Sequence, residues 1–467
     1  MHKDKVFEKS ESKAVPYEYI RDFFVICHPG FFPVYQELGV HWCQSDFTWD
    51  RIESSPGKID FQWIDDMIEE ARKYDVSILP ILDYCARWAS IGDTTNYPPR
   101  KRAYWENYVK MIVSKYSSSP YNLKYYEIWN EPNIEVFWKL DWEKYIDEVM
   151  IPAAKIIHRY NCFVVAPSVT LEHFGYSPAC FEFLQRWNLK NCIERIDEWL
   201  SYHDAYKYID ILSFHYSKGD TGKEKGEGTS NLMPFYDHIY DKWIKSGKIK
   251  GMWNTEEGLT AKKPQGEKET LEPWEKPPYG QWVPRYIIPV LSWAIEHNWD
   301  FKDKYKLFWY ALVGKPTDTL APTKIIIDSG KSRMTEVGMA LKTLTKKIFT
   351  GETSIYQKHK VFSEKGEKLV SYGFRIDNKL IIATWVDKNV KNVEFHLGGL
   401  NKEKSSNLKL SRIDYLSGEE TNINQFKWVL ENRENFLKVS IDTEGQPIIY
   451  LGCGLELNSH KYNVKKE

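Results

Sequence analysis

Short apolar runs rich in valine, isoleucine, phenylalanine and tyrosine recur eight times in the first 310 residues, and stretches with helical spacing separate them. One such stretch has Ile64, Met67, Ile68 and Ala71 at positions i, i+3, i+4 and i+7. A strand that is followed each time by a helix requires parallel pairing, and eight such units that close on one another form a (β/α)8 TIM barrel. The expected strands are Phe23–Cys27, Val40–Gln44, Ile78–Leu82, Tyr125–Trp129, Phe163–Ala166, Ile211–Phe214, Gly251–Thr255 and Lys306–Tyr310.

The chain has 467 residues, more than the roughly 250 that such a barrel needs. After about Ser332 the sequence predicts one more helix, Met334–Lys347, and then segments in which apolar and polar side chains alternate. These segments are Lys368–Phe374, Leu380–Trp385, Val393–Leu397 and Pro447–Leu451. We therefore expect an α/β chain with a barrel domain over residues 1–331, and a second domain over residues 332–467 that holds the last helix and a C-terminal antiparallel β-sandwich.

The charge balance excludes several classes of partner. Lysine and arginine number 64 against 65 aspartates and glutamates, so the chain as a whole has no electrostatic attraction to nucleic acid or to an anionic membrane. No apolar run reaches the roughly 20 residues of a membrane span, and the first residues lack a signal-peptide pattern. We expect a cytoplasmic protein, or a secreted one if a leader was removed, and the oligomeric state stays open.

Motifs for metals and cofactors are missing from the sequence. The seven cysteines form no CxxC pair, and the twelve histidines have no metal-ligand spacing. Phosphate-binding loops, the GxSxG motif and the HExxH motif are absent as well. We expect reduced thiols, no metal and no cofactor.

Two glutamates follow predicted strands. Glu131 lies in the run Trp-Asn-Glu-Pro, whose proline stops the fourth strand and so places this carboxylate at the mouth of the barrel. Glu256 ends the seventh strand, and the adjacent Glu257 stays a rival because neighbouring strand residues point to opposite faces. A pair of carboxyl groups across one mouth is what cleavage of a glycosidic bond requires, since one protonates the leaving oxygen while the other attacks the anomeric carbon or activates water.

With these two motifs the chain resembles the retaining β-glycosidases of glycoside hydrolase clan A, and within the clan it is most similar to family 39. The resemblance implies that Glu131 is the general acid/base and that Asn130 binds the sugar hydroxyl next to the reacting carbon. It also implies that Glu256 is the nucleophile, because the clan's Thr-Glu-x-Gly spacing is matched by Thr255, Glu256 and Gly258. The implied substrate is an oligosaccharide or another glycoside.

The sequence departs from the clan pattern twice. The segment around His215 resembles one in which a histidine and a tyrosine orient the nucleophile, but the usual spacing is His-x-Tyr, and here Tyr216 is adjacent. On the second strand the clan commonly has an arginine near the nucleophile, where this chain has Gln44. Without that cation the pKa of the nucleophile is less depressed. Either another cation such as Arg87 substitutes, or the substrate supplies different chemistry.

Aromatic side chains are candidates for sugar contacts, because 17 of the 19 tryptophans lie at or before Trp309. Trp309 resembles the tryptophan that forms the floor of the cleavage subsite, where a flat indole matches the apolar face of a pyranose. Trp42 and Trp138 are further candidate platforms, with core packing as the competing interpretation. His28 after the first strand and Asp83 at the end of the third are polar candidates for substrate binding.

The sequence thus predicts a retaining glycoside hydrolase that cleaves β-glycosidic bonds by double displacement. Long polar connections over residues 217–230 and 259–281 would suit a closed, exo-type pocket. An endo-acting polysaccharide hydrolase and a transglycosylase of the same clan remain alternatives. Gln44 and the irregular His-Tyr spacing motivate a third, a catalytically silent carbohydrate-binding protein.

Overall fold

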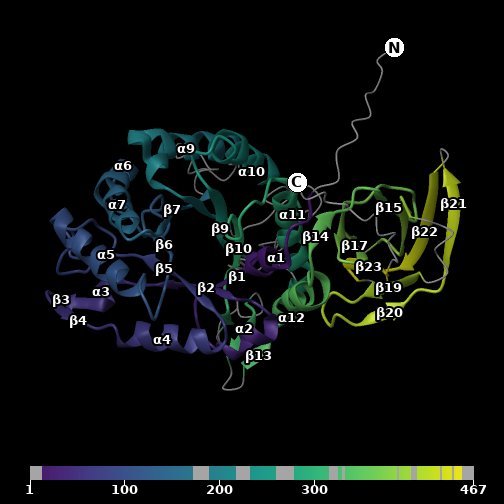
Figure 1. The fold of residues 1–467 in the computed structure, drawn as a ribbon, viewed down its shortest axis with the longest axis horizontal. Coiled ribbons are helices and arrows are strands. Elements are labelled where there is room, and N and C mark those ends of the chain that lie inside the picture. Colours follow the sequence, from purple (N-terminus) through teal and green to yellow (C-terminus); the bar gives the residue numbers. More distant parts are fainter. Residues whose placement is uncertain are drawn as a thin grey trace, which may run out of the picture. The chain divides into compact units, whose positions relative to one another are not determined.

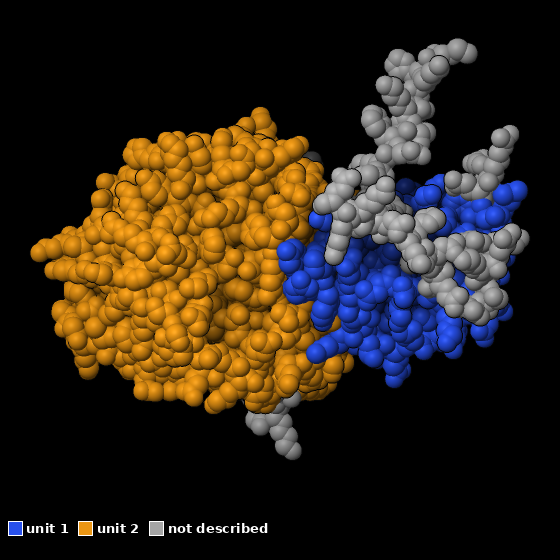
Figure 2. Space-filling model, viewed as in Figure 1, with its two compact units in different colours: residues 1–20, 346–467 blue, residues 21–345 orange. Residues whose placement is uncertain are grey.

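The computed structural model describes residues 13–171, 189–216, 232–258, 278–314, 324–328, 332–386, 389–400, 408–431, 434–443 and 446–454. The chain divides into two compact units, one of residues 21–345 and one of residues 1–20 together with 346–467 (Figure 2). No helix in the described part of the chain is both long enough and apolar enough to span a membrane. The two predicted long connections lie largely outside the described residues.

The larger unit is a closed barrel of eight parallel strands in the order β1-β10-β9-β8-β7-β6-β5-β2, with helices around it (Figure 1). The predicted TIM barrel is therefore confirmed. Its strands are β1 Phe24–Cys27, β2 Trp42–Asp46, β5 Ser77–Leu82, β6 Tyr125–Ile128, β7 Phe163–Thr170, β8 Ile211–Tyr216, β9 Gly251–Glu257 and β10 Tyr305–Trp309. A hairpin of β3 (Glu53–Ser55) and β4 (Lys58–Ile59) and a small sheet of β11 (Val313–Gly314), β12 (Ile326–Asp328) and β13 (Ser332–Met334) belong to the same unit.

The helices pack through the apolar stripes that the sequence predicts. In α4 (Gln62–Lys73), Ile64, Ile68 and Ala71 are buried on one face. The other helices and turns are α1 Tyr17–Phe23, α2 Pro33–Leu38, α3 Trp49–Ile52, α5 Arg102–Tyr116, α6 Trp142–Tyr145, η1 Ile146–Met150, α7 Ile151–Arg159, α9 Leu189–Ser201, η2 Tyr202–Tyr208, α10 Met233–Ile239, η4 Tyr240–Ile244, η6 Tyr279–Gln281, α11 Trp282–Glu296, α12 Glu336–Thr343 and η8 Leu344–Ile348.

The barrel interior changes character along its axis. Near the amino ends of the strands, the ammonium group of Lys306 lies 4.1 Å from the centre of the Trp42 ring. Aliphatic and aromatic side chains such as Val25, Leu79 and Phe308 fill the middle. Toward the carboxyl ends the interior becomes polar and contains the buried side chain of Glu127.

The smaller unit contains two antiparallel sheets that share one hydrophobic cluster. The first sheet consists of β14 Thr353–Ile355, β16 Ser371–Ile376, β17 Lys379–Trp385, β23 Ile448–Gly454, β19 Lys409–Ile413 and β20 Glu420–Asn422. The second consists of β15 His359–Ser363, β18 Asn392–Gly398, β22 Glu434–Asp442 and β21 Phe426–Glu431. The four strands predicted in this region correspond to β16, β17, β18 and β23. Ile382 of the first sheet and Phe395 of the second both belong to the shared cluster.

The boundary between the units falls after Thr345, whereas the sequence placed a domain boundary between residues 331 and 332. The difference is α12, which contacts α2 and α11 of the larger unit. One such contact is the ion pair between Lys342 Nζ and Glu37 Oε1, 2.7 Å apart. An apolar stripe predicts a helix but not the neighbour that covers it. Six cysteines are buried, and Cys180 lies outside the described residues.

Candidate active site

Glu131 lies at the carboxyl mouth of the barrel, three residues after β6 ends at Ile128. The backbone turns sharply here, with left-handed φ values of 67° at Trp129 and 43° at Glu131. The amide of Glu131 donates to the carbonyl oxygen of Ser168 on β7 at 2.9 Å, which fixes the turn against the neighbouring strand. The side chain of Glu131 is 17 % exposed. The turn therefore presents a largely buried carboxylate that solvent still reaches.

A β-bulge in β9 decides which of two adjacent glutamates faces the mouth. Along β8, Phe214 pairs with Asn254 but the next residue pairs with Glu256, so Thr255 is one extra residue on β9. Thr255 points into the barrel, and because of the bulge Glu256 also points to the inner side. Glu257 lies on the outer side, where the side-chain amide of Asn254 donates to it at 2.7 Å.

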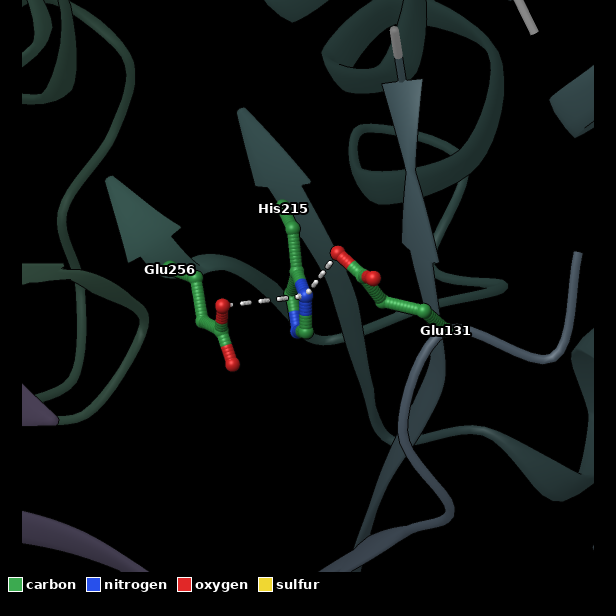
Figure 3. Close-up of side chains that lie close together, drawn as sticks. All are labelled: Glu131, His215 and Glu256. Carbon is green, nitrogen blue, oxygen red and sulfur yellow. Dashed lines mark hydrogen bonds and ion pairs between the residues drawn. The ribbon is translucent and has the colours of Figure 1, made fainter. Parts of the chain in front are cut away.

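His215 of β8 lies between the two glutamates (Figure 3). Its Nδ1 is 3.1 Å from Glu131 Oε1 and 3.7 Å from Glu256 Oε2. One ligand-type atom of each of the three residues lies within 4.8 Å of the others. In the described part of the chain, this is the one cluster whose spacing would also fit a metal ion.

The charges of the cluster shift its titration. Burial raises the pKa of Glu256 to about 7; His215 opposes that rise, and the charges of Glu131 and Glu127 add to it. Burial lowers the pKa of His215, but Glu256 and Glu131 more than offset this and raise it to about 9. His215 is therefore an imidazolium at neutral pH, and its Nδ1–H donates to Glu131.

Polar side chains form the floor beneath the cluster. Glu127, which the sequence analysis did not single out, is fully buried and accepts hydrogen bonds from Gln44 Nε2 (2.6 Å), Ser168 Oγ (2.6 Å) and Thr255 Oγ1 (2.9 Å). One sequence feature could have identified Glu127: it is a charged residue inside a strand whose two faces are both buried. Gln44 thus contacts this floor rather than Glu256.

Other candidate residues line the mouth. His28 Nδ1 lies 3.6 Å from Asp46 Oδ2, and burial lowers the pKa of His28. Asp83 is fully buried beyond Asp46, and burial followed by the charge of Asp46 raises its pKa well above the ordinary value. Asn130 Nδ2 donates to the hydroxyl of Tyr84 at 3.3 Å.

Four of the predicted substrate contacts lie away from the glutamates. Trp309 follows the inward Phe308, so it faces outward and contacts Tyr286 of α11 with a ring separation of 6.0 Å. Trp138 is buried against Trp129, and its indole donates to the carbonyl of Asp141. The structure corrects both predictions, because these rings belong to the helical layer.

Trp42 and Tyr216 also lie away from the two glutamates, each for a different reason. Trp42 begins β2, so it lies at the amino end of the barrel, opposite the mouth. Tyr216 follows the inward His215 and lies on the outer face of β8, the face on which Phe214 contacts Phe235. Neither side chain joins the cluster of Glu131 and Glu256.

Tyr310, rather than Trp309, is the residue of β10 and its loop whose aromatic side chain lies beside the cluster. Burial, followed by the charge of Glu256, raises the pKa of the Tyr310 hydroxyl to about 12. The ring also contacts His28 edge-on, with centroids 5.2 Å apart. Arg87 does not replace the missing arginine, because its guanidinium is 66 % exposed and pairs with Asp50 at 2.6 Å.

In fold, the chain is similar to solved glycoside hydrolases of low sequence identity. A family 39 glycoside hydrolase from the gut symbiont Bacteroides cellulosilyticus WH2 matches with a TM-score of 0.57 and 12% identity, over 93% of this chain and 81% of that one. A glucosidase from Croceicoccus marinus matches with a TM-score of 0.57 and 12% identity, over 96% and 97% of the two chains. A monomeric beta-xylosidase from Caulobacter crescentus CB15 matches with a TM-score of 0.54 and 11% identity, over 96% and 98%. No protein-family model matches the sequence, and neither does any curated protein.

Proposed function

We propose that the chain is a retaining β-glycoside hydrolase in which Glu131 is the acid/base and Glu256 the nucleophile. The observation that carries the proposal is the spacing of the two carboxyl groups, whose nearest oxygens lie within 4.8 Å. Retaining enzymes hold their two carboxyl groups about 5 to 5.5 Å apart, whereas inverting enzymes need about 6.5 to 9.5 Å to admit a water molecule. The likeness in fold to glycoside hydrolases supports the same reaction class.

The proposed reaction has two displacements. In the first, Glu131 protonates the glycosidic oxygen as Glu256 attacks the anomeric carbon, so the bond to the leaving group breaks and a glycosyl-enzyme ester forms. In the second, Glu131 removes a proton from water, which attacks the same carbon and releases Glu256. The charge of Glu256 disappears in the first step, so in the second step Glu131 acts as a base beside a neutral ester.

The surroundings of the two carboxyl groups fit these roles. A nucleophile must be ionised to attack, and the imidazolium of His215 favours the ionised form of Glu256. Asn130 lies next to Glu131, and its side-chain oxygen has no partner among the described residues, which leaves it available to a sugar hydroxyl. We also propose that the two antiparallel sheets of the smaller unit form a β-sandwich, because strands of both contribute to one core.

Trapping of the covalent intermediate tests the proposal. The protein is incubated with activated 2-deoxy-2-fluoro glycosides of β-xylose, β-glucose, β-galactose and β-mannose, followed by intact-mass and peptide mass spectrometry. We expect an adduct of one glycosyl residue on Glu256 within the peptide Gly251–Gly258. Labelling of Glu257 instead would overturn the assignment of the nucleophile.

Two variants sharpen this test. Glu256→Gln should form no adduct, whereas Glu257→Gln is the matched control because that carboxylate lies on the outer face of β9. Hydrolysis of an activated glycoside that persists unchanged in Glu256→Gln would exclude the proposed mechanism. A silent carbohydrate-binding protein would bind a glycan but turn over none of the panel.

The acid role of Glu131 has its own signature. Glu131→Gln should lose about 10²- to 10⁴-fold in kcat/KM on glycosides with poor leaving groups, the usual contribution of general acid catalysis. It should lose far less on substrates whose leaving group needs no proton, such as aryl glycosides with acidic phenols. Equal losses on both kinds of substrate would contradict the assignment.

A further inference from the structure

Glu127 is a buried carboxylate that the proposed mechanism leaves without a role. Its side chain accepts hydrogen bonds from residues of three other strands: Gln44 of β2 on Oε2, and Ser168 of β7 and Thr255 of β9, both on Oε1. Among the described residues, no lysine, arginine or histidine forms a hydrogen bond or an ion pair with it. Three side-chain donors from three strands thus meet on this one buried carboxylate.

Two of these donors are the extra residues of β-bulges. The pairing of β7 with β8 shifts between Pro167 and Val169, which leaves Ser168 unpaired with a left-handed φ of 57°. The pairing of β8 with β9 shifts so that Thr255 is the extra residue. Non-glycine residues persist in strained backbone only when their surroundings hold them there. Oε1 of Glu127 accepts a hydrogen bond from the extra residue of each bulge, and at Ser168 it helps to hold the left-handed backbone.

Each bulge orients one of the two proposed catalytic glutamates. The carbonyl oxygen of Ser168 accepts the amide of Glu131 at 2.9 Å, and Thr255 directly precedes Glu256. Ser168 Oγ also lies 3.0 Å from the hydroxyl of Ser213, two residues before His215 on β8. One carboxylate is thus connected to the backbone segments that carry all three residues of the cluster.

The charge of Glu127 also acts on the cluster. The charged and titratable groups that face His215 are Glu131 and Glu127 from β6 and its turn, Glu256 from β9, and His28 after β1. His215 lies within ion-pair distance of both glutamates, whereas Arg87 pairs with Asp50. A second cation, Lys324, lies over the ring of Tyr310 at 4.3 Å and also acts on His28. Because Gln44 is neutral, the negative charge of Glu127 is left to act on His215.

We propose that Glu127 is a positioning residue that aims Glu131 and Glu256 through the two bulges and holds His215 as the cation that other clan members have on β2. The inference rests on the proposed glycosidase function for its kinetic consequences. Its electrostatic part concerns only this chain's own groups, so it can be measured without turnover.

The decisive experiment compares Glu127→Gln with wild type and with Glu257→Gln, a matched loss of one buried carboxylate on the outer face. The titration of His215 is followed by NMR of protein labelled at histidine Cε1, with His215→Asn to assign the signal. In Glu127→Gln the midpoint should fall by about one pH unit or more, because a nearby negative charge has been removed. It should stay at the wild-type value in Glu257→Gln. An unchanged midpoint in Glu127→Gln would overturn the charge role.

The kinetic readout separates positioning from a merely structural role. In Glu127→Gln both limbs of the kcat/KM profile should move to lower pH, since Glu256 and His215 both lose a neighbouring negative charge. The value of kcat should fall at least about tenfold while KM changes little, because the variant loses the orientation of the catalytic glutamates and keeps its contacts to the substrate. A variant with lower stability but an unmoved profile would show a structural role and overturn the inference. If wild type turns over no glycoside and forms no adduct, the proposed function fails, and the NMR titration still decides the role of Glu127.

Thr255→Val and Thr255→Ser cover the case in which Glu127→Gln does not fold. Valine keeps the shape of the side chain but removes the hydrogen bond to Oε1, so kcat should fall about tenfold and Glu256 should move away from His215 in a crystal structure. Serine keeps the hydroxyl and should restore both. Wild-type turnover with Glu256 in its place in Thr255→Val would overturn the positioning role.

Discussion

The two ends of the barrel interior treat buried charge in opposite ways. At the amino end the fully buried ammonium of Lys306 lies 2.9 Å from Asp303 Oδ1, donates to the backbone oxygen of Asp22 at 2.9 Å, and faces aromatic rings. At the carboxyl end Glu127, Glu131 and Glu256 surround the imidazolium of His215. The amino end pairs a buried lysine with an aspartate, whereas the carboxyl end places three glutamates around one histidine.

The pKa values record this difference. Burial alone would raise the pKa of Asp22, but Lys306, Arg21 and Lys302 outweigh it and lower the value. At the mouth, burial and two neighbouring carboxylates raise the pKa of Glu256 despite His215. Groups whose proton affinity is tuned toward neutral pH are characteristic of sites that transfer protons. Lys306 itself is less favourable, because burial outweighs Asp303 and Asp22 and lowers its pKa. The amino end therefore offsets part of the cost of its buried charge by pairing, whereas the mouth sacrifices stability for reactivity.

The largest effect is expected for Glu256→Gln, which removes the proposed nucleophile and one of the crowded charges. Loss of a nucleophile lowers kcat by about 10⁴-fold or more. In the folded protein the pKa of Glu256 is about 7 rather than 4.5, so ionisation above pH 4.5 costs stability in wild type and not in the variant. The variant should therefore have a higher Tm than wild type at pH 8 and an equal Tm at pH 4, as measured by scanning calorimetry. A lower Tm at pH 8 would contradict the view that the mouth sacrifices stability.

The opposite result is expected at the amino end. Lys306→Met leaves Asp303 without its buried partner, which should lower the free energy of unfolding by about 3 kcal/mol or more. Urea denaturation measures this, while kcat of the folded protein should stay at the wild-type value. The matched control is Lys302→Met, whose partly exposed ammonium pairs with Asp22 and should cost about 1 kcal/mol or less.

The pH dependence of wild type tests the same contrast with an intermediate effect. Only ionised Glu256 attacks, so kcat/KM should rise about tenfold per pH unit below the pKa of Glu256, about 7. It should fall again at higher pH, because the first displacement needs a proton on Glu131 and because His215, with a pKa of about 9, loses its charge there. An optimum near pH 5, as measured with an activated glycoside, would show that the carboxylates of the mouth do not interact as described.

The smallest effect on turnover is expected for a pair of neighbouring aromatic residues. Tyr310→Phe removes the hydroxyl beside Glu256 and should lower kcat a few-fold with little change in stability, since its charge coupling is to the mouth. Trp309→Phe should leave kcat and KM unchanged and cost about 1 to 3 kcal/mol of stability as a core substitution. Steady-state kinetics and urea denaturation of both variants check this, and the reverse pattern would restore Trp309 as the sugar platform.

The barrel could be predicted because each of its eight strands is a separate apolar run with a helical stripe after it. The position of Glu131 at the mouth followed from Pro132, which ends the strand by a local rule. Both features depend on a few consecutive residues. The packing of α12 against α2 brings together residues about 300 positions apart, and α12 also packs against α11. The apolar stripe of a helix does not indicate which other helix it packs against.

Two of the errors at the site, those at Trp309 and Tyr216, have a common cause in strand parity. Trp42 instead lies at the other end of its strand, and Trp138 lies on no barrel strand. Phe308 faces inward, and that makes Tyr310 rather than Trp309 the neighbour of Glu256. Lys306 shares this parity and forms an ion pair with Asp303, three residues earlier, but a lysine inside a strand does not by itself mark the interior face. Glu127 was missed because its hydrogen-bond partners lie on three other strands, which no local pattern identifies.

The bulge in β9 has a consequence for how such a chain can change over generations. If β9 lost the bulge but kept its length, Thr255 would pair with His215 and Glu256 with Tyr216, so Glu256 and Glu257 would exchange their inner and outer places, although neither glutamate is itself altered. Two adjacent glutamates at this strand end therefore act as a reserve: a lineage that loses the bulge still carries a carboxylate on the inner side. The doublet makes the position of the carboxylate tolerant of a one-residue slip in register.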